Sequence, residues 1–400
     1  MKKIIAAFSA LVLFTVFAAA VLMTPSNILY FLNWGEYIDH ALIEKFQEQY
    51  HCQVIEEDVT SSEAMYQKIS SDTTRYDVAI PGDYTVHQLY NEGKLKKLKV
   101  NDSQFPYLEN YKTMFNPSLS KIMDEYMVDK DNHTFNDYFM PYFWGAYSIL
   151  YNTGKSDVES VVKENGFRSL YDRSLYQEDV RIGMYSTARW IVSSYLLSKG
   201  EDPNITSFDG KEENDMDVDF KNDIVTAIKN IRFDEFGDDS LKRNVANGAL
   251  DLCFTQLGDF FDTLYLLCEE GKQDLDDFKV EVPETTACFF DSMVVPTTCQ
   301  NETLANAFIN FMMNPENAYQ NARTIGYSPT LVGVDRMFEE NAEKGELYFE
   351  DGTNSMTLKA FLKRYPMYLN PLYQSDHVYL LKPKSNDYLT TCETIFNNLA

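Results

Sequence analysis

Aromatic and acidic side chains follow several apolar segments of the sequence, in an arrangement that suits an organic cation. The group consists of Trp34, Glu36, Tyr37, Tyr84, Phe289, Phe290 and Asp291. Carboxylates accept charge-assisted hydrogen bonds from ammonium groups, while ring faces cover methylene groups and attract positive charge by about 0.5 to 2 kcal/mol per contact. On composition alone, ordinary core aromatics explain the same rings more simply.

The first of these side chains lie where predicted strands end. Apolar spacing predicts alternating strands and helices, with strands over Asn27–Asn33, Gln53–Glu57 and Tyr76–Ile80 and helices over Ala41–Tyr50, Ser61–Ile69 and Tyr84–Gly93. Such units form a parallel or mixed sheet with helices on both faces, and ligands bind at the carboxyl ends of its strands. We therefore expect Trp34 and the turn from Pro81 to Tyr84 to meet at one crevice.

Two long apolar segments are predicted to carry the chain between two lobes. Pro141–Asn152 is expected to be a strand leading into the second lobe, and Cys288–Pro296 a strand that returns. The remaining predicted strands and helices are Arg181–Met184, Ala188–Lys199, Ile224–Ile231, Leu250–Thr255, Leu304–Met313 and Asn317–Ile325. Two crossings of this kind form a hinge.

The charge of the chain restricts its partners. The 400 residues carry a formal net charge of -26, and aromatic residues make up 14% of the sequence. Nucleic acids and anionic lipids require clustered Lys and Arg, so we expect neither as a partner, whereas a cationic ligand fits this charge. The acidity has a simpler explanation as well, because a highly charged surface keeps a protein soluble.

The N-terminus is predicted to direct export. Lys2 and Lys3 precede an apolar run over Ile4–Met23, and a polar chain follows. This pattern is typical of a signal peptide, and the apolar run is also long enough to span a bilayer. We expect residues 1–25 to be a signal peptide or an N-terminal membrane anchor. The rest of the chain is then exported to the periplasmic space or the extracellular face of the cytoplasmic membrane.

Common enzyme and metal motifs are absent from the sequence. It contains no GxSxG, GxxxxGK[ST], GxGxxG or HExxH motif, its five histidines are scattered, and its six cysteines have no zinc-type spacing. We therefore predict no catalytic residue, no metal and no cofactor. The sequence does not decide between disulfides and buried thiols. It also leaves open calcium binding or simple solvation for Asp215, Asp217 and Asp219.

Longer motifs add a family resemblance. Asn27–Leu98 contains LYFLNWGEY, YDVAIPGDYTV and NEGKLKKL, and it resembles the N-terminal lobe of the spermidine/putrescine-binding proteins of bacterial polyamine ABC transporters. MPYFWGAYSILYN resembles that family's crossing segment, CFFDSMVVP its returning strand, and FINFMMNPENAYQNARTIGYSPT its helix pair and following turn. The resemblance extends to about Thr330, and it is specific because the motifs occur together and in order.

The resemblance implies an α/β protein with the two-lobed type II periplasmic-binding-protein fold, in which a hinge closes both lobes over an interlobe ligand cleft. Residues 26–143 and 289–331 would form lobe 1, and residues 144–288 and 332–400 lobe 2. The implied function is that of a non-catalytic solute-binding protein that captures putrescine or spermidine and delivers it to ABC transporter permease subunits. We expect a monomer, because the carrier must dock on a permease.

The resemblance also implies roles for single residues. The Trp34 ring would pack along the polyamine chain, Glu36 and Tyr37 would make polar contacts beside it, and Asp291 would anchor an amine. The other members of the implied site are Tyr84, Asp259, Phe289 and Tyr327.

Three residues of the second lobe depart from the family pattern. Thr187 and Trp190 stand where the spermidine binders carry acidic residues, and Gln256 replaces a pocket tryptophan. Removing a carboxylate opposite a desolvated ammonium destabilises binding, so the ligand has fewer positive charges or another acid supplies the contact. One alternative is therefore a different small cationic or polar ligand in the same fold, with these three residues in contact with it. Another is an adhesin or enzyme on this scaffold that uses the tail, residues 331–400, which we expect to pack on lobe 2.

Overall fold

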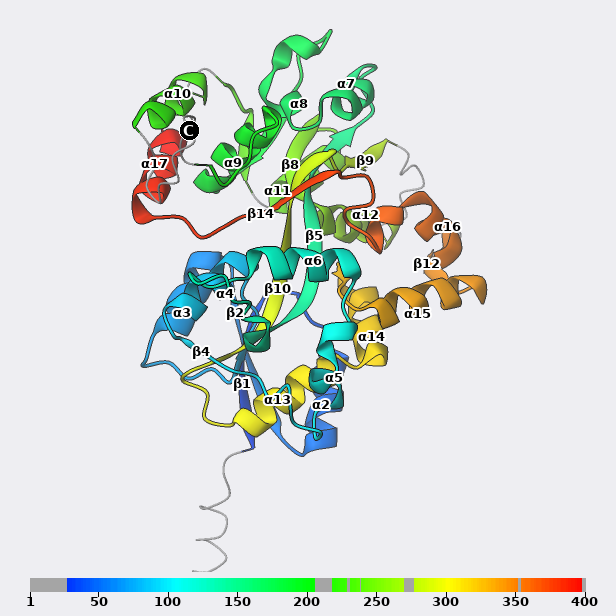
Figure 1. Cartoon of the computed structure of the whole chain (residues 1–400). Helices are drawn as coiled ribbons and strands as arrows, with labels where there is room; N and C mark the ends of the chain where they lie inside the picture. The colour runs from blue at the N-terminus through cyan, green and yellow to red at the C-terminus, as the bar shows by residue number, and fades with distance from the viewer. Residues whose placement is uncertain are drawn as a thin grey trace, which may run out of the picture.

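The molecule consists of two lobes joined by long central strands (Figure 1). It is known from a computed structural model that describes residues 27–205, 218–228, 231–237, 239–269, 277–351 and 354–397. The predicted signal peptide or anchor, residues 1–25, lies outside the described residues, as does the acidic loop around Asp217. Within the described ranges, no helix has both the length and the apolar character needed to cross a membrane.

The first lobe begins with the alternating strands and helices that the apolar spacing predicts. These are β1 (Ile28–Trp34), α2 (His40–Tyr50), β2 (Gln53–Val59), α3 (Ser62–Ser70), β3 (Val78–Ala79), α4 (Asp83–Asn91), β4 (Leu95–Lys96), α5 (Pro106–Glu109) and α6 (Pro117–Tyr126). Helix α3 starts where the side chain of Ser61 accepts a hydrogen bond from the Ala64 amide at 3.1 Å, which satisfies an otherwise unpaired N–H of the first turn.

The chain then enters the second lobe. Its elements are β5 (Phe139–Asn152), α7 (Val158–Asn165), α8 (Arg168–Tyr171), β6 (Ile182–Tyr185), α9 (Ala188–Ser198), α10 (Val218–Ile228), β7 (Glu235–Gly237), α11 (Asp239–Ala246), β8 (Leu252–Gln256), α12 (Leu257–Glu269) and β9 (Phe278–Glu281). Strand β5 is buried along its whole length except at Asn152, because it has neighbours on both edges and layers on both faces.

The last part of the chain returns along β10 and then divides between the two lobes. Its elements are β10 (Thr285–Pro296), α13 (Glu302–Met312), α14 (Pro315–Ile325), β11 (Ser328–Pro329), α15 (Val332–Glu343), β12 (Leu347–Asp351), β13 (Asn354–Thr357), α16 (Leu358–Arg364), β14 (His377–Leu380) and α17 (Asn386–Asn397).

A single continuous sheet connects the lobes. In the described part of the chain its order is β2-β1-β3-β10-β5-β8-β6-β7. Strand β1 is parallel to β2 and β3, whereas β10 runs antiparallel to β3 and β5. Strand β5 pairs with β10 in its first half and with β8 and β9 in its second, so β5 and β10 form the link between the lobes (Figure 1). The lobe boundaries at residues 143 and 289 stay a prediction.

The described residues form two hydrophobic cores. The first surrounds β1 and β3 and includes Phe31, Phe46 and Phe308. The second surrounds β6, β8 and α9 and includes Ile191 and Phe254. The first core also extends into the second lobe, where it includes Phe260 and Phe261 of α12 and Phe278 of β9.

The tail, which we assigned to lobe 2, is shared between the cores. Phe338 of α15 and Phe361 of α16 belong to the first core together with Phe261 of α12. Tyr388 and Cys392 of α17 belong to the second core, where α17 lies against α9. The tail therefore covers two sides of the molecule.

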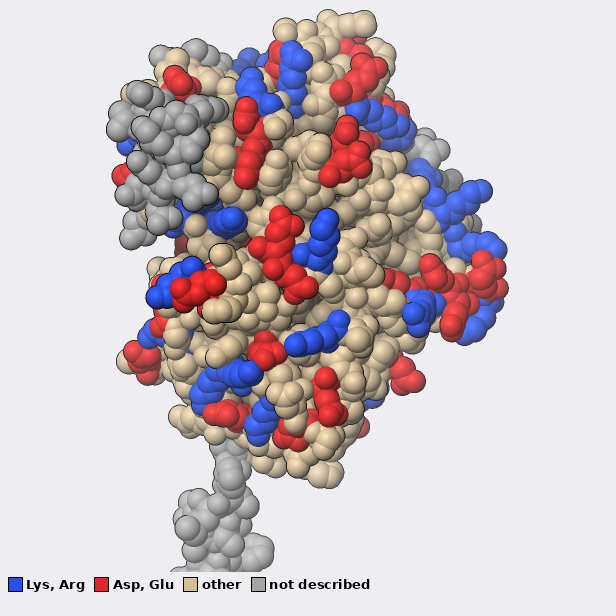
Figure 2. Space-filling model, in the orientation of Figure 1, with Lys and Arg blue, Asp and Glu red and all other residues tan. Residues whose placement is uncertain are grey.

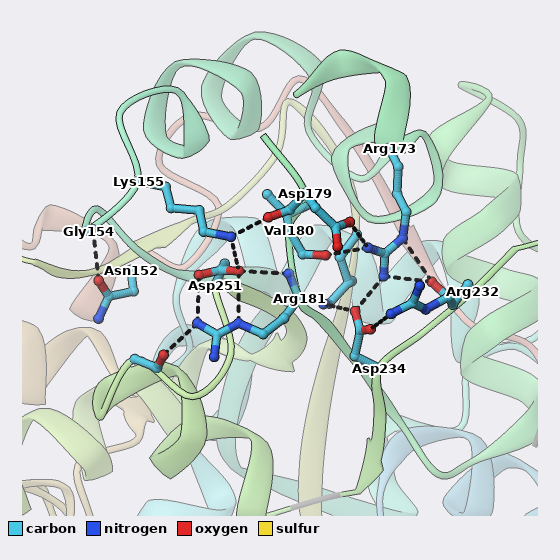
Figure 3. Close-up of polar contacts among 12 residues, drawn as sticks. Asn152, Gly154, Lys155, Arg173, Asp179, Val180, Arg181, Arg232, Asp234 and Asp251 are labelled. Carbon is cyan, nitrogen blue, oxygen red and sulfur yellow. Dashed lines mark hydrogen bonds and ion pairs between the residues drawn. The ribbon is translucent and has the colours of Figure 1, made fainter. Parts of the chain in front are cut away.

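A polar network fixes the start of β6 (Figure 3). Asp251 accepts hydrogen bonds from the Arg181 amide at 2.7 Å and from Lys155 Nζ at 3.0 Å. Asp234 accepts one from the Ile182 amide at 2.8 Å and is also paired with Arg173. These contacts hold the strand whose other end carries Tyr185.

The face of the molecule in Figure 2 is mixed in charge, and five cysteines are free thiols. Figure 2 shows one face on which acidic and basic side chains alternate in small groups, with no large basic patch among the described residues of that face. Free thiols are found at Cys52, Cys253, Cys288, Cys299 and Cys392. For these five positions, the structure decides the question that the sequence left open.

Candidate functional site

A cavity of about 470 Å³ lies between the lobes and receives side chains from both. Elements of lobe 1 supply Trp34 at the end of β1 and Tyr84 in α4, and elements of lobe 2 supply Tyr185 at the end of β6 and Trp190 in α9. The cavity is therefore formed by strand ends and helix starts, as expected for a sheet of this type.

Two carboxylates face the cavity from lobe 1, of which Asp83 is buried and Asp291 half-buried. The Tyr37 hydroxyl donates a hydrogen bond to Asp291 at 2.6 Å, and the Phe290 amide donates one to Asp83 at 3.1 Å. Burial raises the pKa of Asp291 to about 6, although the Tyr37 hydrogen bond lowers it. Burial also raises the pKa of Asp83 to about 7. The hydrogen bond from the Phe290 amide lowers this pKa, and the negative charge of Asp291 raises it. Both carboxylates would be stabilised by an added cation.

A third carboxylate enters from lobe 2. Asp259, near the start of α12, accepts hydrogen bonds from the Thr255 hydroxyl at 2.8 Å and the Tyr327 hydroxyl at 3.3 Å, and from the Tyr185 hydroxyl. Gly258 makes this arrangement possible, because a Cβ atom there would overlap the Tyr327 ring. Asp259 is thus held by three hydroxyl groups, and Lys242 Nζ lies 3.9 Å from its Oδ1.

Aromatic rings form much of the remaining wall. The Trp34 indole donates a hydrogen bond to the Ile80 carbonyl at 2.8 Å, which fixes the ring at the end of β1. Tyr147 lies 4.1 Å from Trp190 and 5.5 Å from Phe289 between ring centres. Phe289 can approach β5 because its partner there is Gly145, which has no side chain to displace it. These faces suit the methylene groups of an aliphatic ligand.

One basic side chain also lines the cavity. Arg189 of α9 is only 8% exposed. Its guanidinium carbon lies 4.0 Å from the centre of the Tyr84 ring and 5.3 Å from that of Trp190. The cavity therefore contains a buried cation as well as three acids.

The structure brings together nearly all residues predicted from the sequence. The cavity is lined by Trp34, Tyr37, Tyr84, Asp259, Phe289, Asp291 and Tyr327, and by the second-lobe candidates Thr187, Trp190 and Gln256.

Glu36 is the exception. It is exposed and does not line the cavity, because the chain turns after Trp34 and Glu36 adopts a left-handed conformation with φ of 55°. The turn directs Tyr37 inward instead.

Among the lining residues that sequence reasoning missed, four carry aromatic or charged side chains next to the predicted ones. These are Asp83, Tyr147, Tyr185 and Arg189. Asp83 lies in the turn that we singled out for Tyr84, and Arg189 lies between the two departures Thr187 and Trp190, so in both cases the local signal was present. The position of Tyr147 in the middle of a long apolar strand gave no sign that it faces a cavity.

The candidate metal ligands of the described residues lie outside the cavity. Among the described residues, one group could hold a metal ion, namely Asp129, Asp131 and His133 in a loop of lobe 1. These side chains are exposed or half-exposed, and exposed acidic groups are common without an ion.

Curated proteins and solved structures resemble this chain over most of its length. The spermidine/putrescine-binding periplasmic protein of Escherichia coli (strain K12) is 28% identical over 327 residues, which are 81% of this chain and 83% of that protein. A putative spermidine/putrescine ABC transporter structure from Listeria monocytogenes has a TM-score of 0.63 at 25% identity and covers 94% of this chain and 99% of its own.

A third match gives the same fold. The spermidine/putrescine ABC transporter substrate-binding protein PotD from Streptococcus pneumoniae has a TM-score of 0.64 at 25% identity, covering 93% of this chain and 98% of its own. The two-lobed periplasmic-binding-protein fold predicted from the sequence is thus confirmed.

The sequence profile of a family described as bacterial extracellular solute-binding protein matches residues 41–346. Proteins of this kind bind substrates for ABC transporters and are not enzymes, which agrees with the absence of catalytic motifs in the sequence. The match, the fold and the interlobe cavity together lead to one conclusion: the chain belongs to the bacterial extracellular solute-binding proteins.

Proposed function

We propose that this protein captures a small organic amine of the polyamine type, such as putrescine or spermidine, and delivers it to an ABC importer. The observation that carries the proposal is the pair of carboxylates, Asp83 and Asp291, at the lobe 1 side of the cavity. Within the described residues, neither Asp83 nor Asp291 forms an ion pair, although Asp83 is buried and Asp291 is half-buried. An ammonium group would donate charge-assisted hydrogen bonds to them.

The walls of the cavity support the same ligand class. Trp34, Tyr147 and Phe289 present ring surfaces that can cover methylene groups, and ring faces attract cations. The similarity to spermidine/putrescine-binding proteins adds support. Closure of the lobes would then bury the ligand and create the surface that a permease recognises.

The proposed location follows from the predicted N-terminal segment. Export by a signal peptide, or retention by an N-terminal anchor, would place the cavity in the periplasm or at the outer face of the cytoplasmic membrane. We expect the protein to act there as a monomer.

Calorimetric titration of the purified protein tests the ligand class. Putrescine, spermidine, spermine and agmatine are titrated at low and high salt concentration, and we expect saturable one-to-one binding of at least one of them. Asp291→Asn should weaken that binding by about 1.5 to 3 kcal/mol, because it removes a charged acceptor. Asp72→Asn is the matched control, since the Asp72 side chain is 80% exposed. No binding of any of the four amines would refute the proposal.

A second candidate is the same transport role with a different small cationic or polar ligand. It is favoured by Thr187, Trp190 and Gln256, which leave the lobe 2 wall without the acidic groups of the spermidine binders. Combining Thr187→Asp with Trp190→Glu should create spermidine binding if these positions select the ligand. An unchanged ligand profile of the double variant would argue against their role in selection.

A further inference from the structure

Arg189 is a buried cation that has no hydrogen-bonding partner among the described residues. The side chain extends from the first turn of α9 to the cavity and is 8% exposed. Within the part of the chain that the structure describes, it makes no hydrogen bond and no ion pair, and its recorded contacts are with the rings of Tyr84 and Trp190. The rings cover the flat faces of a guanidinium, but its N–H groups point outward in the plane and need acceptors.

The residues around Arg189 do not give it a carboxylate that is fully ionised at neutral pH. The residues adjacent in sequence are Ala188 and Trp190, with Thr187 before them, and none of these is acidic. Asp83 is the carboxylate on which the charge of Arg189 acts, yet burial keeps the pKa of Asp83 at about 7, so it is only partly ionised near neutral pH. Lys384 adds to the positive charge, because burial and then the charge of Arg189 lower its pKa to about 8.

The acids and the guanidinium enter the cavity from different elements. Asp291 comes from β10 and Asp259 from α12, whereas Arg189 comes from α9. Burial and the Tyr37 hydroxyl set the pKa of Asp291, and Asp259 is held by Thr255 and Tyr327 hydroxyl groups. The cavity thus offers acceptors for a cation and, separately, donors for an anion. A linear diamine or triamine would leave the guanidinium N–H groups without an acceptor and would bring a second ammonium into its vicinity.

We infer that Arg189 binds an anionic group of the ligand, and that the preferred ligand is an ω-amino acid with an ammonium group held by Asp291 and a carboxylate held by Arg189. The inference rests on the proposed capture of an organic amine and specifies what the other end of that amine carries. A planar guanidinium recognises a carboxylate by two parallel hydrogen bonds, a geometry that an ammonium cannot use. The rings of Tyr147 and Trp190 would enclose the methylene groups between the two ends.

Matched pairs of ligands of equal chain length test this inference by calorimetry. Putrescine is compared with γ-aminobutyrate, and cadaverine with δ-aminovalerate, so that each pair differs only in one terminal group. We expect each amino acid to bind more tightly than its diamine. Arg189→Gln should weaken binding of the amino acids roughly 10- to 100-fold, while binding of the diamines is unchanged or improves. Arg189→Lys should retain part of the preference, because it keeps the charge but not the planar donors.

Arg168→Gln is the control, since the Arg168 side chain is 53% exposed and pairs with Asp172. Circular dichroism of each variant verifies that the fold is intact, and the comparison of ligand pairs on the native protein needs no variant at all.

The outcomes separate this inference from the proposed function. Binding of diamines but not of amino acids would overturn the inference and leave polyamine capture intact. An equal loss of both ligand classes in Arg189→Gln would also overturn it, because it would show that Arg189 only supports the cavity wall. No measurable binding of any amine-bearing ligand would refute the proposed function and the inference together.

Discussion

The guanidinium carbon of Arg189 lies 4.0 Å from the centre of the Tyr84 ring, so that a helix of lobe 2 touches a helix of lobe 1 across the cavity. This contact joins the two lobes directly at the cavity that they enclose. Cation–π contacts of this kind contribute about 0.5 to 2 kcal/mol, which is enough to change the populations of open and closed forms.

Replacing Tyr84 by Leu should shift the ligand-free protein toward the open form. The leucine keeps an apolar side chain but has no ring face for the guanidinium. Small-angle X-ray scattering of the ligand-free protein should therefore show a larger radius of gyration for Tyr84→Leu. Tyr66→Leu is the control, because Tyr66 hydrogen-bonds Glu92 on the surface. Identical scattering curves for Tyr84→Leu and the native protein would contradict a role in closure.

Amine binding should strengthen as the pH rises. An ammonium needs ionised carboxylates, and the pKa values of Asp291 and Asp83 are raised to about 6 and about 7. Affinity for the tightest amine should therefore rise from about pH 5 and level off near about pH 8. Tyr37→Phe removes the hydrogen bond that lowers the pKa of Asp291, so the rise should move to higher pH. A flat profile across this range would show that neither carboxylate titrates with binding.

Gly258→Ala should destabilise the protein and weaken ligand binding. A methyl group at this position overlaps the Tyr327 ring, which must move away from Asp259. Overpacking of this kind lowers the free energy of unfolding by about 1 to 3 kcal/mol. Unfolding in urea measures this change. Gly333→Ala is the matched control, because its nearest atoms in Pro315 are 3.5 Å away and alanine favours a helix by up to about 1 kcal/mol. Equal stability of the two variants would contradict the packing argument.

Removing the charge of Asp251 should change the stability of lobe 2 and its response to acid. Burial raises the pKa of Asp251, but hydrogen bonds from Arg181 and Lys155 outweigh this effect and hold the pKa below its ordinary value. Its contribution is therefore present above the unfolded pKa of about 3.9 and is lost as the pH falls through the lower folded pKa.

We expect Asp251→Asn to lower the free energy of unfolding by about 1 to 3 kcal/mol at neutral pH and to reduce its dependence on pH below about pH 4. Asp179→Asn serves for comparison, because its side chain is 81% exposed in the same network. Chemical denaturation at a series of pH values measures both effects. A pH dependence that is the same in Asp251→Asn and the native protein would exclude this linkage.

Much of the site could be predicted because it follows local signals. Trp34 comes at the end of an alternating apolar strand, and Tyr84 follows a Pro-Gly break, so both were placed at strand ends from the sequence alone. Asp291 and Tyr327 were found through motifs that occur in a fixed order. Glu36 could not be placed in this way, because its exposure depends on the left-handed turn after Trp34.

The sequence by itself determined the alternation of strands and helices, the two crossing segments and the family, because these depend on periodicity and on motifs within short stretches of chain. Only the tertiary structure decided which charges share the cavity. The bond between Asp83 and the Phe290 amide spans 207 positions, and the contact between Arg189 and Tyr84 joins two lobes. Burial is a property of the assembled lobes, so the raised pKa values of Asp83 and Asp291, and the enclosure of the Arg189 guanidinium, arise only when α4, β10 and α9 come together.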